Sequence, residues 1–262
     1  PWVQAIMMAL HEKQLGYLRT TVPPLQVFLK WGPMMPAISI DDEPWFLEST
    51  EILCRLGYSQ VADEDMLAIR QAWTGVMHRT DYWPRFWGEF SLASDPNPNL
   101  ARRFVNNFLR AFTILYFFIL IRFGVFSRGY GDPDNHADAY IHWEERLAES
   151  NCQFLGGDKP DSEDLLLFGI VQCHSSIPGP PLAPLRDDDR LSALRRWIGR
   201  MHERFGGYSH LYSGPYFEPQ RSAPQSAGFV QRLAFYVGLF GMFTALPLTL
   251  PLVLYLMRKA PR

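Results

Sequence analysis

The feature that most constrains this sequence is an uncharged run near its C-terminal end. Residues 233–257 form 25 consecutive positions without a charged side chain, bounded by Arg232 before the run and by Arg258 and Lys259 after it. A helix needs about 20 apolar residues to cross the hydrocarbon core of a bilayer. We therefore expect this run to be a membrane segment and to hold the protein on a membrane.

Two prolines leave the path of this segment open. Pro247 and Pro251 both lie within the run. One proline kinks a membrane helix, whereas two near its middle also permit a hairpin that enters and leaves on the same side. Basic residues flank both ends of the run, so the distribution of positive charge does not decide which end faces the cytosol.

The composition of the chain argues against several other classes of protein. The 25 basic and 27 acidic residues give a net charge of −2, which offers no electrostatic reason to expect a nucleic-acid partner. Cys54, Cys152 and Cys173 form neither a CxxC pair nor a zinc-like spacing with histidine. We therefore expect reduced thiols and no metal site. The seven histidines are interpreted as surface residues or as satisfied core residues.

The first sixty residues combine helical and strand-like patterns. Apolar spacing predicts a helix from Pro1 that ends near Gly16, and a β-prone stretch follows at residues 17–22. Residues 37–40 and 45–47 are predicted to be two strands joined by a turn at residues 41–44. A helix over residues 49–56 should then end at Gly57, because glycine is common just after a helix.

From residue 63 onward the strand patterns disappear. Helical spacing predicts five helices, at residues 66–77, 100–121, 137–148, 164–173 and 191–205. Four prolines within residues 178–184 predict a loop, and residues 208–227 are predicted to be a linker. The uncharged residues 111–121 are too few to span a bilayer. We assign them to the core of this helical part or to a face lying on the bilayer.

Two motifs in the first part could bind a ligand. Met35 and Pro36 enter the predicted hairpin, where Pro36 is either an ordinary trans residue at an edge strand or a cis residue that turns the backbone of Met35 outward. Glu48 and Ser49 open the next helix, where Ser49 suits the N-cap position. A helix N-terminus favours a carboxylate ligand, and Glu48 offers a partner for an ammonium group. The alternative interpretation of this second motif is a plain helix cap.

A third motif concerns folding. Asp161 precedes Asp164 by three positions at the start of an apolar helix, which is the spacing of a capping box. Two acids make the reciprocal pair poorly, so Ser162 could shift the register of the cap.

The order of these elements and the three motifs resemble the glutathione-transferase family over roughly residues 1–207. The resemblance implies an α/β thioredoxin-like N-terminal domain over residues 1–58, with its first strand missing from this sequence. An all-α C-terminal domain follows over residues 62–207. Residues 208–232 are then a linker, and residues 233–257 form a C-terminal transmembrane or re-entrant helix.

The resemblance also implies a glutathione site. The family holds glutathione at positions that match Met35, Pro36, Glu48 and Ser49 of this chain. Family members often carry Gly-Lys/Arg-Val before the cis-proline, whereas this chain has Trp-Gly-Pro-Met-Met, with Lys30 as the nearest base. The catalytic Ser, Tyr or Cys of the family is expected just upstream of Pro1, outside this sequence.

The function implied is conjugation or exchange of glutathione with a hydrophobic electrophile at a membrane. Glutathione as co-substrate, a hydrophobic small molecule and a membrane are the expected partners, and a homodimer is expected by analogy. An aromatic group at residues 82–90 is expected to pack in the core, or alternatively to line the pocket for the electrophile. The folded part should face the cytosol. The alternative is a non-catalytic, membrane-anchored adaptor that resembles metaxins.

Overall fold

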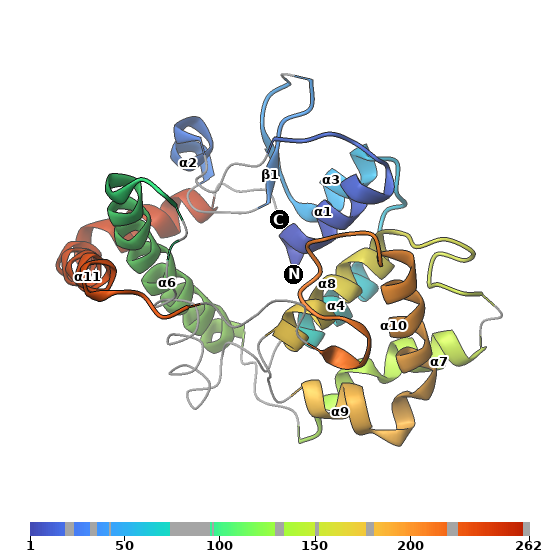
Figure 1. The fold of residues 1–262 in the computed structure, drawn as a ribbon. Helices are drawn as coiled ribbons and strands as arrows, with labels where there is room; N and C mark the ends of the chain where they lie inside the picture. Colours follow the sequence, from blue (N-terminus) through green and yellow to red (C-terminus); the bar gives the residue numbers. More distant parts are fainter. Residues whose placement is uncertain are drawn as a thin grey trace. The chain divides into compact units, whose positions relative to one another are not determined.

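The chain forms two compact units, and most of the described residues are helical (Figure 1). The computed structural model describes residues 1–18, 24–31, 36–41, 43–73, 95, 97–128, 134–149, 152–176, 181–218 and 225–258. Unit 1 comprises Pro1–Val76, Asp132–Arg221 and Ala260–Arg262, and unit 2 comprises Met77–Gly131 and Ser222–Lys259.

The described elements of unit 1 begin with α1 (Trp2–Glu12), α2 (Leu25–Trp31), β1 (Ala37–Ile38), β2 (Phe46–Leu47), α3 (Ser49–Arg55) and α4 (Asp63–Ala72). They continue with η2 (His136–Tyr140), α7 (Ile141–Glu149), α8 (Ser162–Ser176), α9 (Leu182–Asp187), η3 (Asp189–Leu191), α10 (Ser192–Arg204) and η4 (Pro215–Phe217). Those of unit 2 are the long helices α6 (Leu100–Arg128) and α11 (Phe229–Arg258).

The sheet of unit 1 is small. β1 and β2 pair antiparallel, with Ala37 opposite Leu47 and Ile38 opposite Phe46, so the predicted hairpin is confirmed. Residues 17–18 of the β-prone stretch expected at residues 17–22 are not in a strand, and its other residues lie outside the described part. Within the described residues the sheet has two strands. The expected α/β thioredoxin-like domain is therefore seen only as helices around one hairpin.

Helix α2 is an element that the sequence pattern does not predict. It begins directly after Pro24 and has seven residues, too few for a helical period to stand out. Val27 and Trp31 of this helix are buried against Leu47 of the hairpin. Burial of these apolar side chains against the sheet, rather than local periodicity, accounts for α2.

The core of unit 1 is built around α8. Its apolar side chains point in all directions, and the residues from Leu165 to Phe168 are completely buried. A helix that is apolar on every side must be covered on every side, and α1, α3 and α4 all pack against it. At Gly169 a Cβ would lie 2.7 Å from the backbone oxygen of Pro1, so α1 and α8 approach closely. Apolar residues of α1, α3 and α4 thus share one core with those of α7, α8 and α10.

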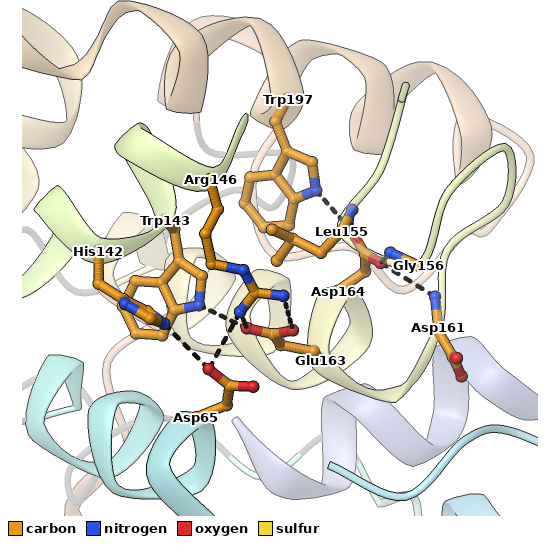
Figure 2. Close-up of polar contacts among 10 residues, drawn as sticks. All are labelled: Asp65, His142, Trp143, Arg146, Leu155, Gly156, Asp161, Glu163, Asp164 and Trp197. Carbon is orange, nitrogen blue, oxygen red and sulfur yellow. Dashed lines mark hydrogen bonds and ion pairs between the residues drawn. The ribbon is translucent and has the colours of Figure 1, made fainter. Parts of the chain in front are cut away.

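The start of α8 confirms the third motif and its role in folding. The carboxylate of Asp164 accepts hydrogen bonds from the backbone N–H groups of Asp161 at 3.0 Å, Leu155 at 2.9 Å and Gly156 at 2.9 Å (Figure 2). It also accepts a bond of 2.7 Å from Nε1 of Trp197, so one acid joins α8, α10 and the loop between α7 and α8. Ser162 does not shift the register.

The two acids avoid mutual repulsion because Asp161 turns to other partners. Its Oδ1 accepts bonds from the backbone N–H groups of Ser162 and Ser59, both at 2.8 Å. Burial tends to raise the pKa of Asp161, but the bonds from Ser59 and Ser162 outweigh it and the pKa is lowered. A local cap thereby also ties the segment after α3 to α8.

In unit 2, α6 packs against α11. Ala111, Ile114 and Phe235 are buried between the two helices. A Cβ on Gly238 would lie 2.8 Å from the backbone oxygen of Phe108, so the backbones approach closely at this point. Residues 111–121, which we expected in the core of the helical part or on the bilayer, thus belong to a helix that contacts the C-terminal segment.

Helix α11 contains the uncharged run. It continues as one helix of 30 residues through Pro247 and Pro251, which favours a single helix over a hairpin. Such a helix is about 45 Å long, more than the roughly 30 Å of a hydrocarbon core. Within the described residues, α11 is the one helix long and apolar enough to cross a membrane, and most of its residues are not buried.

Candidate functional site

The end of the hairpin brings three of the four predicted ligand-binding residues together. In the antiparallel register, Pro36 precedes β1 on the side where Glu48 follows β2, so these residues stand opposite each other. Ser49 is the next residue and begins α3, and its side chain is buried. Met35 lies outside the described residues.

Glu48, rather than Ser49, is the N-cap of α3. Its Oε2 accepts a hydrogen bond of 2.9 Å from the backbone N–H of Thr50 and another from the Thr50 hydroxyl. The prediction that Ser49 occupies the cap is therefore wrong by one residue. Glutamate is long enough to fold back onto the second helical residue, an arrangement that the usual preference for short side chains at this position does not anticipate.

The backbone of Glu48 is strained. Its φ is 89° and its ψ is 115°, a region that L-residues with a Cβ rarely adopt. Strain of this kind costs about 1–3 kcal/mol and gathers at functional sites, where the surrounding structure enforces it. The conformation directs the carboxylate back over the first turn of α3 instead of along the strand.

The Glu48 carboxylate keeps the capacity to bind a cation. Both described bonds end on Oε2, and Oε1 has no partner within the described residues. A carboxylate can accept about four hydrogen bonds. An ammonium group could therefore bind Oε1 without breaking the cap of α3.

Arg55 fixes the hairpin on α3. Its guanidinium lies 4.0 Å from the centre of the Phe46 ring and pairs with Glu51 at 3.1 Å and with Glu43 at 3.3 Å. Exposed pairs of this kind are individually worth less than about 1 kcal/mol. Together with the ring contact, they hold the hairpin end and the start of α3 in a fixed relation.

Lys30 is engaged elsewhere. Its Nζ lies 4.2 Å from the centre of the Trp31 ring, where the ring face attracts the ammonium group. The aromatic group at residues 82–90, the candidate wall of a pocket, lies outside the described residues.

A second polar cluster joins α4, α7 and α8. Ligand atoms of Asp65, His142 and Glu163 lie within 4.8 Å of one another, the separation that a shared metal ion would require (Figure 2). Arg146 already supplies positive charge there, with bonds of 2.6 and 2.9 Å to Glu163 and 3.0 Å to Asp65. A metal ion would have to displace this guanidinium. We interpret the cluster as an ion-pair network that holds the three helices together.

The same network explains the electrostatics of Glu163. Burial raises the pKa of its carboxyl group, and the bonds from Arg146 and from Nε1 of Trp143 at 2.8 Å offset only part of that effect. His142 adds a contact of 2.9 Å to Asp65.

Two buried histidines were not singled out by the sequence analysis. His174 bonds to the backbone oxygen of Ala72 at 3.0 Å, and His202 lies 3.5 Å from Nε2 of Gln172. Within the described residues, Nδ1 of each ring has no partner, so the expectation of satisfied core histidines holds for one nitrogen of each. Burial lowers the pKa of both rings to about 4, which keeps them neutral at neutral pH.

The cysteines and the comparisons add no further site. No disulfide joins Cys54, Cys152 and Cys173. No family model, curated protein or solved structure gave a significant match to this chain.

Proposed function

We propose that this chain is a membrane-anchored protein of the glutathione-transferase type that binds glutathione at the end of the β1–β2 hairpin. The observation that carries the proposal is Glu48. It is strained, stands opposite Pro36 and precedes the first turn of α3. The glutathione-transferase family holds its ligand at the positions that match Pro36, Glu48 and Ser49. The hairpin and α3 also have the order along the chain that the resemblance leads us to expect.

The ligand chemistry follows from the two charges at the γ-glutamyl end of glutathione. The ammonium group pairs with Oε1 of Glu48, and the carboxylate meets Ser49 at the N-terminus of α3, where backbone N–H groups favour negative charge. In the glutathione-transferase family, the backbone of the residue that matches Met35 pairs with the peptide part of the ligand. Transfer of the glutathione thiol to a hydrophobic electrophile is the reaction that we propose for this site.

The place of action is a membrane. α11 is long and apolar enough to span one, and we propose that it anchors the folded part on the cytosolic side, where glutathione is plentiful. A hydrophobic co-substrate dissolved in the bilayer would then be concentrated near the site.

Calorimetry with glutathione on the detergent-solubilised full chain tests the site. Glu48→Gln combined with Ser49→Ala should weaken binding about tenfold or more, because a charge-assisted contact is worth about 1.5–3 kcal/mol. Glutamine can still accept the bond from Thr50, so the cap of α3 should survive.

Glu64→Gln is the matched control. It removes one exposed carboxylate from the next helix of unit 1, α4, and should leave affinity unchanged. Equal affinity of the double variant and the unaltered chain would rule out this site. If the unaltered chain does not bind glutathione at all, the adaptor resembling metaxins is the better function.

A further inference from the structure

The order of the two units along the chain limits whether α6 can cross a membrane. Unit 1 is made of residues before and after this helix, so both ends of α6 lead back into the same folded body. Only residues 129–131 separate α6 from the second part of unit 1. The sequence from residue 77 to residue 99 carries Arg79, Asp81, Arg85 and Glu89, and therefore has no apolar run of about 20 residues that could cross a bilayer. If the parts of unit 1 on either side of α6, Pro1–Val76 and Asp132–Arg221, stay on the same side of a membrane, α6 cannot cross it.

Nevertheless, α6 is coupled to the candidate membrane helix. The Gly238 contact and the buried Ala111, Ile114 and Phe235 join the two helices along their apolar faces. Gln231, near the start of α11, accepts bonds from Asn107 at 3.3 Å and from the backbone N–H of Asp95 at 2.8 Å. The first half of α6 is therefore held beside the first half of α11.

The charges of the two units are opposite in sign. Unit 2 has ten basic and three acidic residues, whereas unit 1 has 15 basic and 24 acidic residues. α6 contains five arginines and no acid. A net charge of +7 on the unit that contains the apolar helices is typical of a surface that meets anionic lipid headgroups.

The first turns of α6 expose both basic and apolar side chains. Arg102 is exposed. Arg103, Asn106 and Arg110 lie on another side of the helix, where Arg103 donates to the backbone oxygen of Asn97, Asn106 donates to Asp95 and Arg110 is half-buried. Phe104 and Val105 are 46% and 51% exposed on other sides. Long helices with an arginine-bearing face and an apolar face lie in the plane of the membrane interface.

We propose that α6 is a second membrane element that lies along the bilayer surface on the side of unit 1, with the exposed Arg102 in contact with anionic headgroups. It does not span. It forms a platform from which α11 enters the membrane, and the contact at Gly238 sets the angle between them. The proposal rests on α11 as the membrane segment, and alkaline washing tests that point separately.

Thiol labelling of sealed vesicles tests the topology. In the full chain with Cys54, Cys152 and Cys173 replaced by Ser, a single cysteine is placed at the first residue of α6, the exposed Leu100, or after α6, at the exposed Asp134. A membrane-impermeant maleimide should react with both positions from the same side. Reaction from opposite sides would show that α6 spans and would overturn the proposal.

Lipid contact is tested with a fluorophore on Leu100→Cys in the same background. A nitroxide-labelled phosphatidylserine headgroup should quench it more than a nitroxide-labelled phosphatidylcholine headgroup does. One basic residue near an anionic surface contributes about a fivefold enrichment, so Arg102→Glu should reduce the excess several-fold. Arg186→Glu changes an exposed arginine of unit 1 and is the matched control. It should leave the excess quenching by phosphatidylserine unchanged. Equal quenching by the two lipids would refute recognition of anionic headgroups.

A glycine pair tests the coupling of the helices. Gly238→Val should separate α6 from α11 and move the Leu100→Cys fluorophore, because a Cβ would meet the Phe108 backbone at 2.8 Å. Gly241→Val in the same helix meets nothing within 4 Å and should leave the fluorophore in place. An identical response of the two variants would show that the contact does not position α6.

Discussion

The most informative perturbation of unit 1 is Asp164→Asn. Asp164 is completely buried and its carboxylate accepts four hydrogen bonds. Oδ1 accepts the bonds from Leu155 and Trp197, and Oδ2 accepts those from Gly156 and Asp161. Asparagine has nearly the same shape but carries an NH2 group in place of one oxygen. Whichever way the amide lies, two N–H donors must face another donor.

The expected cost follows from those two donors. A buried donor left without an acceptor costs about 1–3 kcal/mol, so two cost roughly 2–6 kcal/mol. Burial also raises the pKa of Asp164 against the opposing effect of its four bonds, which shows that the charge itself is costly in this place. Removing the charge offsets part of the loss. We therefore expect a net loss of about 3 kcal/mol, out of the roughly 5–15 kcal/mol that is typical of a folded domain.

Urea unfolding of the full chain in mild detergent, followed by tryptophan fluorescence, measures this loss. With a slope of about 2 kcal/mol per molar urea, the midpoint of unit 1 should fall by roughly 1.5 M. Asp158→Asn, at an exposed position of the same loop, should shift the midpoint by less than about 0.3 M. A loss below about 1 kcal/mol for Asp164→Asn would mean that the four bonds do not hold α8 and α10 together.

Three further predictions concern pH, packing and the membrane. Because burial lowers the pKa of His174 and His202 from 6.5 to about 4, the unfolded chain binds more protons than the folded chain between these values. The free energy of unfolding should thus fall as the pH drops from about 6.5 to about 4, by on the order of 2–3 kcal/mol per ring. Replacing both His174 and His202 by Gln should make this free energy less dependent on pH, as measured by urea unfolding at several pH values. Gly169→Ala should lower the thermal midpoint, at a cost of about 1–3 kcal/mol, because its Cβ would lie 2.7 Å from a backbone oxygen, whereas Gly199→Ala meets nothing within 4 Å and should be neutral or stabilising. Alkaline carbonate should leave the full chain on membranes but release a chain that ends at Phe217, and release of both would exclude α11 as the anchor.

The features that the sequence alone determined are those encoded by neighbouring residues. The uncharged residues 233–257 predict α11, because span length depends on a local count of apolar positions. Alternation and turn residues predict the hairpin, and Gly57 marks the end of α3 with a φ of +83°, as expected for a glycine in that place. The Asp161 and Asp164 spacing likewise predicts the cap of α8.

Other features depend on contacts between residues far apart in the chain. α9 begins within residues 178–184, whose prolines predict a loop. It forms a helix because Leu182 and Leu185 are buried against the rest of unit 1. The sequence pattern of α6 predicts a helix of the soluble core. Only its close packing on Gly238 shows that α6 pairs with α11.

The candidate site divides in the same way. The sequence indicated Pro36, Glu48 and Ser49 from their order alone, because each stands next to a local signal of strand or helix. That Glu48 is strained, caps α3 and stands opposite Pro36 was decided by the register of β1 and β2 and by the packing that holds φ at 89°. Local propensity disfavours this conformation, so only tertiary contacts can enforce it.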